Sequence, residues 1–189
     1  MEKDSSIQYT RLTDTLRGKL VYLRQPKRDE VPFVQALWAD PATMEAVGGH
    51  WPLPTEKFDR WYAYVVDPGS PGGCYCLIFR EDDIPVGEVN FFQWNPEDRS
   101  AVLNIKVMAK YRGHGYGADA LTTFLSWFFN QAGGRKMIDD VALKNPGGRR
   151  LLESVGFEQV HNRNPAHDCD AADVCMLDIT KEMFESKHG

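Results

Sequence analysis

A cluster of glycines constrains the fold of this chain more than any other feature of its sequence. Gly113, Gly115 and Gly117 lie between a strand-like run, Ala101–Met108, and a helical stretch that begins at Ala118. Glycine tolerates positive φ angles and lets a ligand approach the main chain closely. The first turn of the following helix presents unpaired N–H groups and the positive end of the helix dipole. The sequence therefore predicts an α/β fold in which this turn binds an anion such as a pyrophosphate.

Three other interpretations of this turn compete with the first. Gly113-x-Gly115-x-x-Ala118 matches a dinucleotide-binding fingerprint, with Asp139 near the usual downstream distance. However, residues 109–112 separate the glycines from the strand, and no second half of such a fold follows. A P-loop requires Gly-Lys-Ser/Thr at its end, which this turn lacks. The turn could also bind nothing, because a lone glycine motif is a weak signal.

The rest of the chain predicts one domain of mixed strands and helices. Residues 1–17 are polar without a sustained period and predict a flexible tail, so the domain covers residues 18–189. Residues 41–54 are rich in proline and glycine and predict a loop. Apolar periods predict the other elements. Strands are expected at 19–24, 74–80, 85–94, 101–108, 136–143, from Phe157 and at 173–179, and helices after Asp29, from Thr55, at 118–132 and at 147–155.

Composition argues against several kinds of partner. The 189-residue chain is 42% hydrophobic with a formal net charge of -5, so it has no basic surplus to neutralise a nucleic acid. Its longest apolar run is far shorter than a membrane span, and no signal peptide precedes its cysteines, Cys74, Cys76, Cys169 and Cys175. We therefore expect a cytoplasmic protein with free thiols and without a nucleic-acid or membrane partner.

No metal site is expected. The run His167-Asp168-Cys169-Asp170 groups four possible metal ligands beside Pro165. The run is short, and no second pair of ligands follows at a suitable spacing. A solvated loop is the simpler interpretation, because such runs specify a metal only loosely.

Two motifs resemble those of the GNAT superfamily of N-acetyltransferases. The segment Val107-x-x-x-x-Arg112-x-x-Gly115-x-Gly117 is similar to the acyl-CoA signature of that superfamily, (Arg/Gln)-x-x-Gly-x-(Gly/Ala), which follows the fourth strand. The segment Asn145–Phe157 looks like the second motif, an asparagine followed by a short helix that ends in Gly-Phe. The resemblance covers roughly Gly18 to Ile179 as an order of elements, and it is specific mainly at these two motifs.

Other segments resemble one branch of that superfamily, the enzymes that acetylate the N-terminal alanines of ribosomal proteins. These segments are the opening Gly18-x-Leu20-x-Tyr22-Leu23-Arg24, then Trp51-Pro52 followed by Thr55-Glu56, and Asp119-Ala120 after the glycine turn.

The resemblance implies a single-domain, mixed α+β, GNAT-like fold. In such a fold a central, mostly antiparallel, twisted sheet of about seven strands is flanked by about four helices. It also implies an enzyme that moves an acetyl group from acetyl-CoA to a primary amine, a protein N-terminus or a small molecule, by direct attack on the thioester. We expect a monomer or a homodimer. The residues implied for CoA binding are Val107, Met108, Arg112, Gly113, His114, Gly115, Tyr116, Gly117, Ala118, Asn145 and Arg150.

Attack on a thioester requires a neutral amine, whereas a free primary amine titrates at about pH 10. The protein must therefore remove a proton, directly or through water. Glu88 is the candidate base: related enzymes often use a carboxylate on a central strand, and Glu88 shares a strand face with Asn90. That face either lines the cleft or meets solvent, because one sequence does not fix the register. Asn90 and Trp51 are the candidate substrate contacts. Val102 stands where many members of the branch carry glutamate.

The acid that would protonate the departing thiolate is not evident. The resemblance implies a tyrosine and a serine hydroxyl near the sulfur, but Leu152 and Gly148 occupy those positions. Asn145 either caps the short helix or hydrogen-bonds the pantetheine arm, and both roles can hold. The missing hydroxyls leave a non-catalytic acyl-CoA-binding or regulatory module as the alternative function. A nucleotide-dependent oxidoreductase would rest on the glycine fingerprint alone.

The acceptor is not identified by the motifs. Specificity is expected in loops, here residues 46–60, with residues 162–172 as a segment that could close over them.

Overall fold

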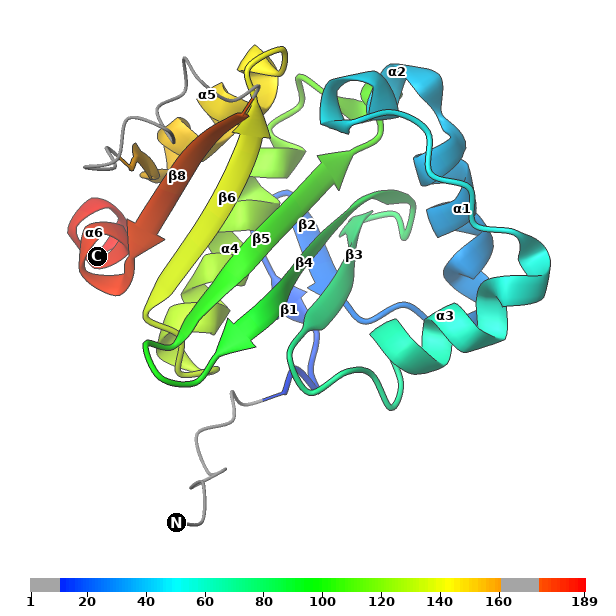
Figure 1. Cartoon of the computed structure of the whole chain (residues 1–189), viewed down its shortest axis with the longest axis horizontal. Helices are drawn as coiled ribbons and strands as arrows, with labels where there is room; N and C mark the ends of the chain where they lie inside the picture. Colours follow the sequence, from blue (N-terminus) through cyan, green and yellow to red (C-terminus); the bar gives the residue numbers. More distant parts are fainter. Residues whose placement is uncertain (1–10, 161–173) are drawn as a thin grey trace.

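One twisted sheet organises the part of the chain that the computed structural model describes, residues 11–160 and 174–189 (Figure 1). Its strand order is β1-β2-β3-β4-β5-β6-β8-β7. The strands are β1 (Leu16–Arg17), β2 (Val21–Arg24), β3 (Cys74–Arg80), β4 (Pro85–Asn95), β5 (Ser100–Val107), β6 (Lys136–Ala142), β7 (Glu158–Gln159) and β8 (Val174–Thr180). The helices are α1 (Val31–Ala39), α2 (Pro41–Met44), α3 (Phe58–Val65), α4 (Tyr116–Asn130), α5 (Pro146–Val155) and α6 (Lys181–His188), with 3-10 turns η1 (Arg28–Glu30), η2 (Glu45–Val47), η3 (Thr55–Lys57) and η4 (Ala109–Tyr111).

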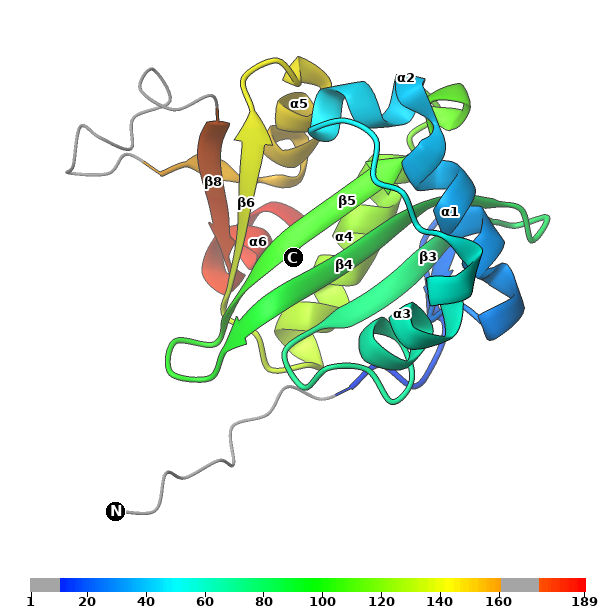
Figure 2. The ribbon, with the colours of Figure 1, turned by 45° about the vertical axis from the view of Figure 1, so that its right-hand side comes forward.

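Neighbouring strands of this sheet are antiparallel, except for the parallel pair β5 and β6. Helix α4 covers one side of the sheet, while α1 and α3 lie on the other (Figures 1 and 2). The arrangement is the mixed, mostly antiparallel sheet with flanking helices that was expected.

Strand β3 separates two hydrophobic cores, because its successive side chains point to opposite faces. Cys74, Cys76 and Ile78 pack in the core that contains α4, whereas Tyr75, Leu77 and Phe79 pack in the core with α1 and α3. Both faces of β3 are therefore buried, and its sequence is an unbroken apolar run rather than an alternation. The second core fixes α1 and α3 over the β3 and β4 part of the sheet, where the candidate base lies.

Two expectations about the N-terminal third are wrong in detail. Residues 11–17, predicted as tail, belong to the domain: Leu12 is 5% exposed and Leu16 pairs with Leu23 across β1 and β2. A strand of two residues is too short to show a period. The predicted loop at 41–54 contains α2 and η2, because the Asp40 side chain accepts a hydrogen bond from Thr43 N (3.0 Å) and caps a first turn that begins with Pro41.

Helix α6 was not expected either. Thr180 ends β8 and caps the helix by accepting from Met183 N (3.3 Å). Among the helix residues only Phe184 is buried, so the sequence carries almost no apolar period there.

The cysteines follow the prediction only in part. Cys74 and Cys76 are buried free thiols, but Cys175 is disulfide-bonded, so the expectation of a free thiol is wrong at that position. Spacing along the sequence could not reveal this, because a disulfide needs only two cysteines that the fold brings together. Cys169 and the rest of the His167–Asp170 run lie outside the described residues.

Candidate active site

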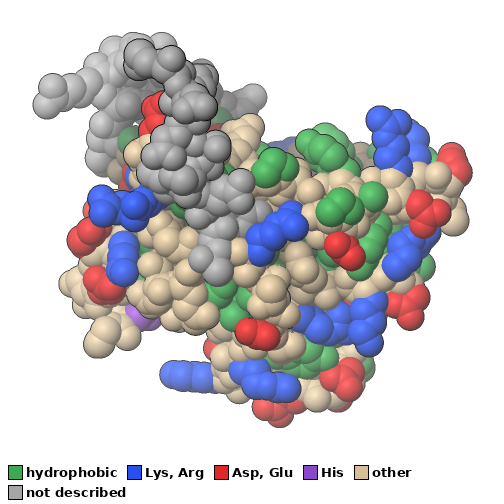
Figure 3. Space-filling view, turned by 90° about the horizontal axis from the view of Figure 1, so that it is seen from below, with side chains coloured by type: hydrophobic (Ala, Val, Ile, Leu, Met, Phe, Trp, Pro, Cys, Tyr) green, Lys and Arg blue, Asp and Glu red, His purple; other side chains and the backbone are tan. Residues whose placement is uncertain are grey.

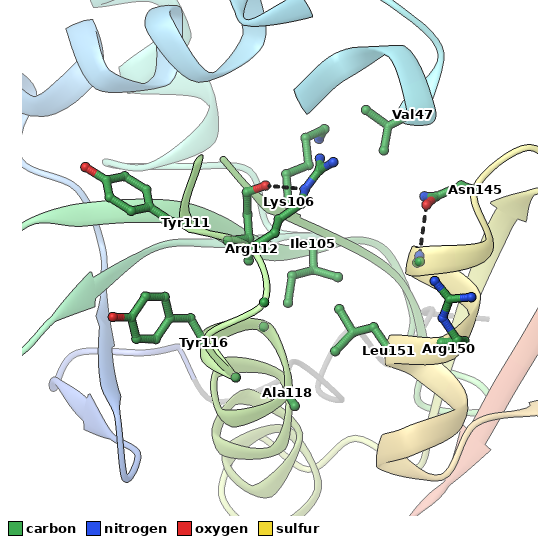
Figure 4. Close-up of a pocket in the computed structure, with 16 residues that line it drawn as sticks. Val47, Ile105, Lys106, Tyr111, Arg112, Tyr116, Ala118, Asn145, Arg150 and Leu151 are labelled. Atoms are coloured by element: carbon green, nitrogen blue, oxygen red, sulfur yellow. Dashed lines mark hydrogen bonds between the residues drawn. The ribbon is translucent and has the colours of Figure 1, made fainter. Parts of the chain in front are cut away.

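Strands β5 and β6 separate after a short parallel contact. They pair only from Ser100↔Lys136 to Val102↔Ile138. Beyond it β5 continues along β4, and β6 continues along β8. A cavity of about 490 Å³, which we call the fork cavity, is lined by the carboxyl end of β5, the glycine turn, the start of α4 and the start of α5 (Figure 4).

The fork cavity brings together most of the residues predicted to bind CoA. Those that line it are Val107, Arg112, Gly113, Gly115, Tyr116, Gly117, Ala118, Asn145 and Arg150. Met108 and His114 are not among the lining residues: Met108 N bonds Val86 O (2.9 Å), and exposed His114 stacks on Tyr116 with 5.5 Å between ring centroids. The lining residues that were not among those implied for CoA binding are Val47, Ile105, Lys106, Tyr111, Gly147, Gly148 and Leu151.

Main-chain N–H groups at the start of α4 supply the anion-binding chemistry. Gly113 and Gly115 have φ angles of 80° and 81°, which glycine adopts without a steric penalty. The first N–H with a helical partner is that of Asp119, which bonds Gly115 O (3.1 Å). Among the described residues, the N–H groups of 113–118 have no acceptor. The helix dipole adds positive potential at the same place.

The charged side chains around the fork cavity are all basic among the described residues: Lys106, Arg112 and Arg150. Arg112 is mainly a brace, because its guanidinium donates to the carbonyls of Val107 (3.0 Å) and Thr43 (3.0 Å). This ties η4, and the turn after it, to α2. The cavity therefore combines free main-chain donors with net positive charge, as a diphosphate requires.

Asn145 caps α5 rather than pointing freely into the fork cavity. Its side-chain oxygen accepts from Gly148 N (2.8 Å) (Figure 4). A Cβ on Gly148 would lie 2.5 Å from Asn145 Nδ2, so the glycine accommodates this orientation. Asn145 still lines the cavity, and a role for its remaining polar atoms in binding is compatible with the cap.

Leu152 lies in the core at 1% exposure, and it is Leu151 that lines the fork cavity. We therefore expect Leu152→Tyr to lower the free energy of unfolding by about 1–3 kcal/mol, because the larger ring overpacks the core and buries a hydroxyl without a partner. Turnover should not rise. Urea unfolding and a thiol-release assay on the same preparation test this, and a stable variant with faster turnover would place the hydroxyl near the sulfur after all.

The candidate base is held by four donors. Glu88 is 0% exposed. One carboxylate oxygen accepts from Lys106 Nζ (2.7 Å) and Asn104 Nδ2 (3.1 Å), and the other accepts from Trp38 Nε1 (2.8 Å) and the Tyr75 hydroxyl. Burial, followed by the neighbouring Glu88 charge, raises the pKa of Tyr75 well above its usual value. The expected solvent-facing alternative for Glu88 is excluded by this burial.

Two more cavities adjoin this network. The aromatic cavity, of about 580 Å³, is lined by Trp38, Trp61, Tyr64, Val65, Ser70, Gly72, Gly73, Cys74, Tyr75, Glu88, Asn90, Phe91, Phe92, Gln93, Asn104 and Lys106. The small cavity, of about 300 Å³, is lined by Trp38, Met44, Val47, Trp51, Asn104 and Lys106. The expected substrate contacts Asn90 and Trp51 thus line different cavities, and Lys106 lines all three.

Asp139 is the second carboxyl near the fork. It follows Ile138, the last β6 residue paired with β5. Burial, followed by the neighbouring Asp140 charge, raises the pKa of Asp139 to about 7, and the Lys106 charge opposes the shift.

The raised pKa predicts a pH-dependent stability. A protonated Asp139 favours the folded state, so this contribution is complete below the unfolded pKa of about 4 and is lost as the pH rises through about 7. Between about pH 4 and pH 8 the loss should be on the order of 2 kcal/mol, because Asp139 is half-buried rather than fully buried and solvent screening weakens the effect. In Asp139→Asn, urea unfolding across this range should show a flatter profile, and an unchanged slope would assign the effect to another group.

One face of the molecule is mixed in charge. Figure 3 shows acidic and basic side chains interspersed over one face, with apolar side chains between them. No helix in residues 11–160 or 174–189 is long and apolar enough to cross a membrane. The same residues contain no group of three or more potential metal ligands.

Comparison with known proteins identifies related sequences and folds. Residues 21–158 match the family model described as an acetyltransferase (GNAT) domain. Comparison with curated protein sequences gave no match. Among solved structures, a Vibrio cholerae spermidine N-acetyltransferase in complex with CoA and spermine is 18% identical, with a TM-score of 0.74 over 88% of this chain and 98% of its own. An acetyltransferase of the GNAT family from Bacillus anthracis is 16% identical, with a TM-score of 0.71 over 89% of this chain and 99% of its own. These likenesses confirm the expected fold class.

Proposed function

The chain belongs to the GNAT family of acetyltransferases, and from this premise we propose that it transfers an acetyl group from acetyl-CoA to the nitrogen of a primary amine. The observation that carries the proposal is the set of N–H groups at the start of α4. Among the described residues these groups have no acceptor, and the charged residues that line the adjoining cavity are all basic. The pyrophosphate of CoA would bind residues 113–118, and the pantetheine arm would follow the unpaired edge of β5 toward Lys106.

The transfer step needs few protein groups. The amine nitrogen attacks the thioester carbonyl, the carbon–sulfur bond breaks, and the nitrogen loses a proton. A thiol has a pKa of about 8.5, so its thiolate is a fair leaving group even without an acid. Glu88 remains the candidate base in this proposal. Its four donors weigh against direct proton transfer and favour a role in which it holds Lys106, Tyr75 and Trp38 in place.

Assignment to the branch that acetylates ribosomal-protein termini is a finer proposal. Its support is the contact between two of the resembling segments: Asp119 accepts from the N–H groups of Lys19 (3.0 Å), Leu20 (2.7 Å) and Val21 (3.1 Å). A Cβ on Gly18 would lie 2.3 Å from the same carboxylate. These residues are thus coupled by structure, which explains their joint presence but does not identify an acceptor.

A two-step experiment tests the proposed function. Calorimetry with acetyl-CoA and with CoA should show binding to the purified chain. Thiol release in the presence of primary amines, with product masses, should then show an added acetyl group. Binding without turnover on any amine would favour the alternative, a non-catalytic acyl-CoA-binding module, for which the absence of a hydroxyl at buried Leu152 is the supporting observation.

A further inference from the structure

The aromatic side chains exposed on this protein are concentrated at two cavities. Among the described residues the exposed large aromatics are Trp51 (65%), Tyr64 (71%) and Phe92 (42%). Trp51 lines the small cavity, whereas Tyr64 and Phe92 line the aromatic cavity. An exposed group of large apolar side chains commonly marks a binding site, because leaving it in water is unfavourable.

Deeper in the aromatic cavity the walls are also aromatic and are held rigidly. The Trp61 ring packs edge-on against Trp38 (5.8 Å between centroids) and against Tyr75 (5.2 Å). The polar ends of Trp38 and Tyr75 are both bonded to Glu88. The rings are therefore preorganised, and a planar or apolar group can enter without a large cost in side-chain entropy.

The charges at these cavities do not suit a polycation. Among the described residues that line either cavity, the only carboxylate is Glu88 and the only cation is Lys106. Glu88 is 0% exposed and already accepts from four donors, one of which is the Lys106 ammonium at 2.7 Å. No described carboxylate remains at the lining to receive the second ammonium group of a diamine or polyamine.

We infer that the acceptor is a small primary monoamine whose amino group is joined by a short chain to an aromatic or bulky apolar group. The inference rests on the proposed function and names its substrate class. The ring would occupy the aromatic cavity, and the amine would reach Lys106, where all three cavities meet. The spermine-binding structural neighbour is therefore a guide to the fold of this chain and not to its acceptor.

Lys106 also suits the chemistry of such an acceptor. A cation beside the reacting amine disfavours its ammonium form and favours the neutral nucleophile. A second ammonium on the acceptor would lie in the aromatic cavity, where it would lose its hydration without a free carboxylate among the described lining residues to pair with. A monoamine has no second ammonium group and therefore avoids this cost.

Two matched pairs of amines test the inference on the unmodified protein. 2-Phenylethylamine and ethylamine differ by the ring. We expect kcat/KM to be higher for 2-phenylethylamine by about 50-fold or more, since a filled apolar pocket discriminates between substrates on this scale. Hexylamine and 1,6-diaminohexane differ by the second charge, and kcat/KM should be higher for hexylamine by about tenfold or more. Equal or reversed preference in either pair overturns the inference. No turnover on any of the four also overturns the inference, whereas bound acetyl-CoA without turnover on any primary amine, protein N-termini included, overturns the proposed function itself.

Variants assign the preferences to the cavity. Trp61→Ala should reduce the ratio of kcat/KM for 2-phenylethylamine to kcat/KM for ethylamine by about tenfold or more, and Trp61→Phe should restore most of that ratio. Lys106→Met should raise the use of 1,6-diaminohexane relative to hexylamine, because Glu88 loses its cationic partner and can then pair with an ammonium group. If Lys106→Met does not fold, Trp61→Ala and Trp61→Phe still test the inference. An equal loss of kcat/KM for 2-phenylethylamine and ethylamine would mean that the ring of the acceptor lies elsewhere.

Discussion

Ala118→Glu is expected to weaken acetyl-CoA binding by about 100-fold, the size of two charge-assisted hydrogen bonds. Ala118 is the third residue of α4, after Gly115 as N-cap, and its side chain lines the fork cavity. A glutamate there is favourable for the helix, because it can bond the free N–H groups and complement the dipole. The new carboxylate would occupy the place proposed for the pyrophosphate and repel it.

The uncharged Ala118→Gln is the matched control. Glutamine has the same shape as glutamate, so this variant measures the steric effect alone. We expect it to weaken acetyl-CoA binding by about tenfold at most. The melting temperature of Ala118→Glu should be no lower than that of Ala118→Gln. Added salt should narrow the difference between the two affinities. If calorimetry gives both variants the affinity of the parent, the pyrophosphate does not bind at the start of α4.

The glycine turn could be predicted from sequence because its chemistry is local. Strand, positive-φ glycines and helix start follow one another along the chain, and together they create the donors at 113–118. The second motif is local in the same way, since Asn145 caps the helix that it precedes. These two segments fix much of the lining of the fork cavity before any tertiary structure is known.

The centre of the site could not be read in this way, because it forms across strands. Lys106 and Asn104 lie opposite Glu88 and Asn90 only through the β4–β5 register. Alternation along β5 would have placed both polar side chains on one face, and this signal was present in the sequence. Their approach to Glu88, however, depends on the register between the strands, which one sequence does not fix. The contribution of Trp38 from α1 depends on helix packing and left no local signal.

Glu88→Gln is expected to destabilise the protein by about 3–5 kcal/mol, the cost of leaving one partner of a buried ion pair alone. The amide oxygen can still accept from Lys106 and Asn104, but the amide nitrogen would face the Trp38 N–H and the Tyr75 hydroxyl, which are donors. In Glu88→Gln/Lys106→Met both charges are removed. The decrease in the free energy of unfolding of this double variant, measured with urea, should be smaller than the sum of the decreases for Glu88→Gln and Lys106→Met.

Turnover separates the two roles of Glu88. If Glu88 is a base, the loss of turnover in Glu88→Gln should shrink as the pH approaches the pKa of the amine. If Glu88 is a positioning group, turnover should be lower than that of the parent by about 100-fold at every pH. Because both carboxylate oxygens are occupied, we expect the constant deficit. Glu30→Gln is the control: Glu30 pairs with Arg24 at 2.6 Å, and neither residue lines the three cavities. It should lose stability and keep its turnover, so a matching loss of turnover there would trace the effect of Glu88→Gln to general destabilisation.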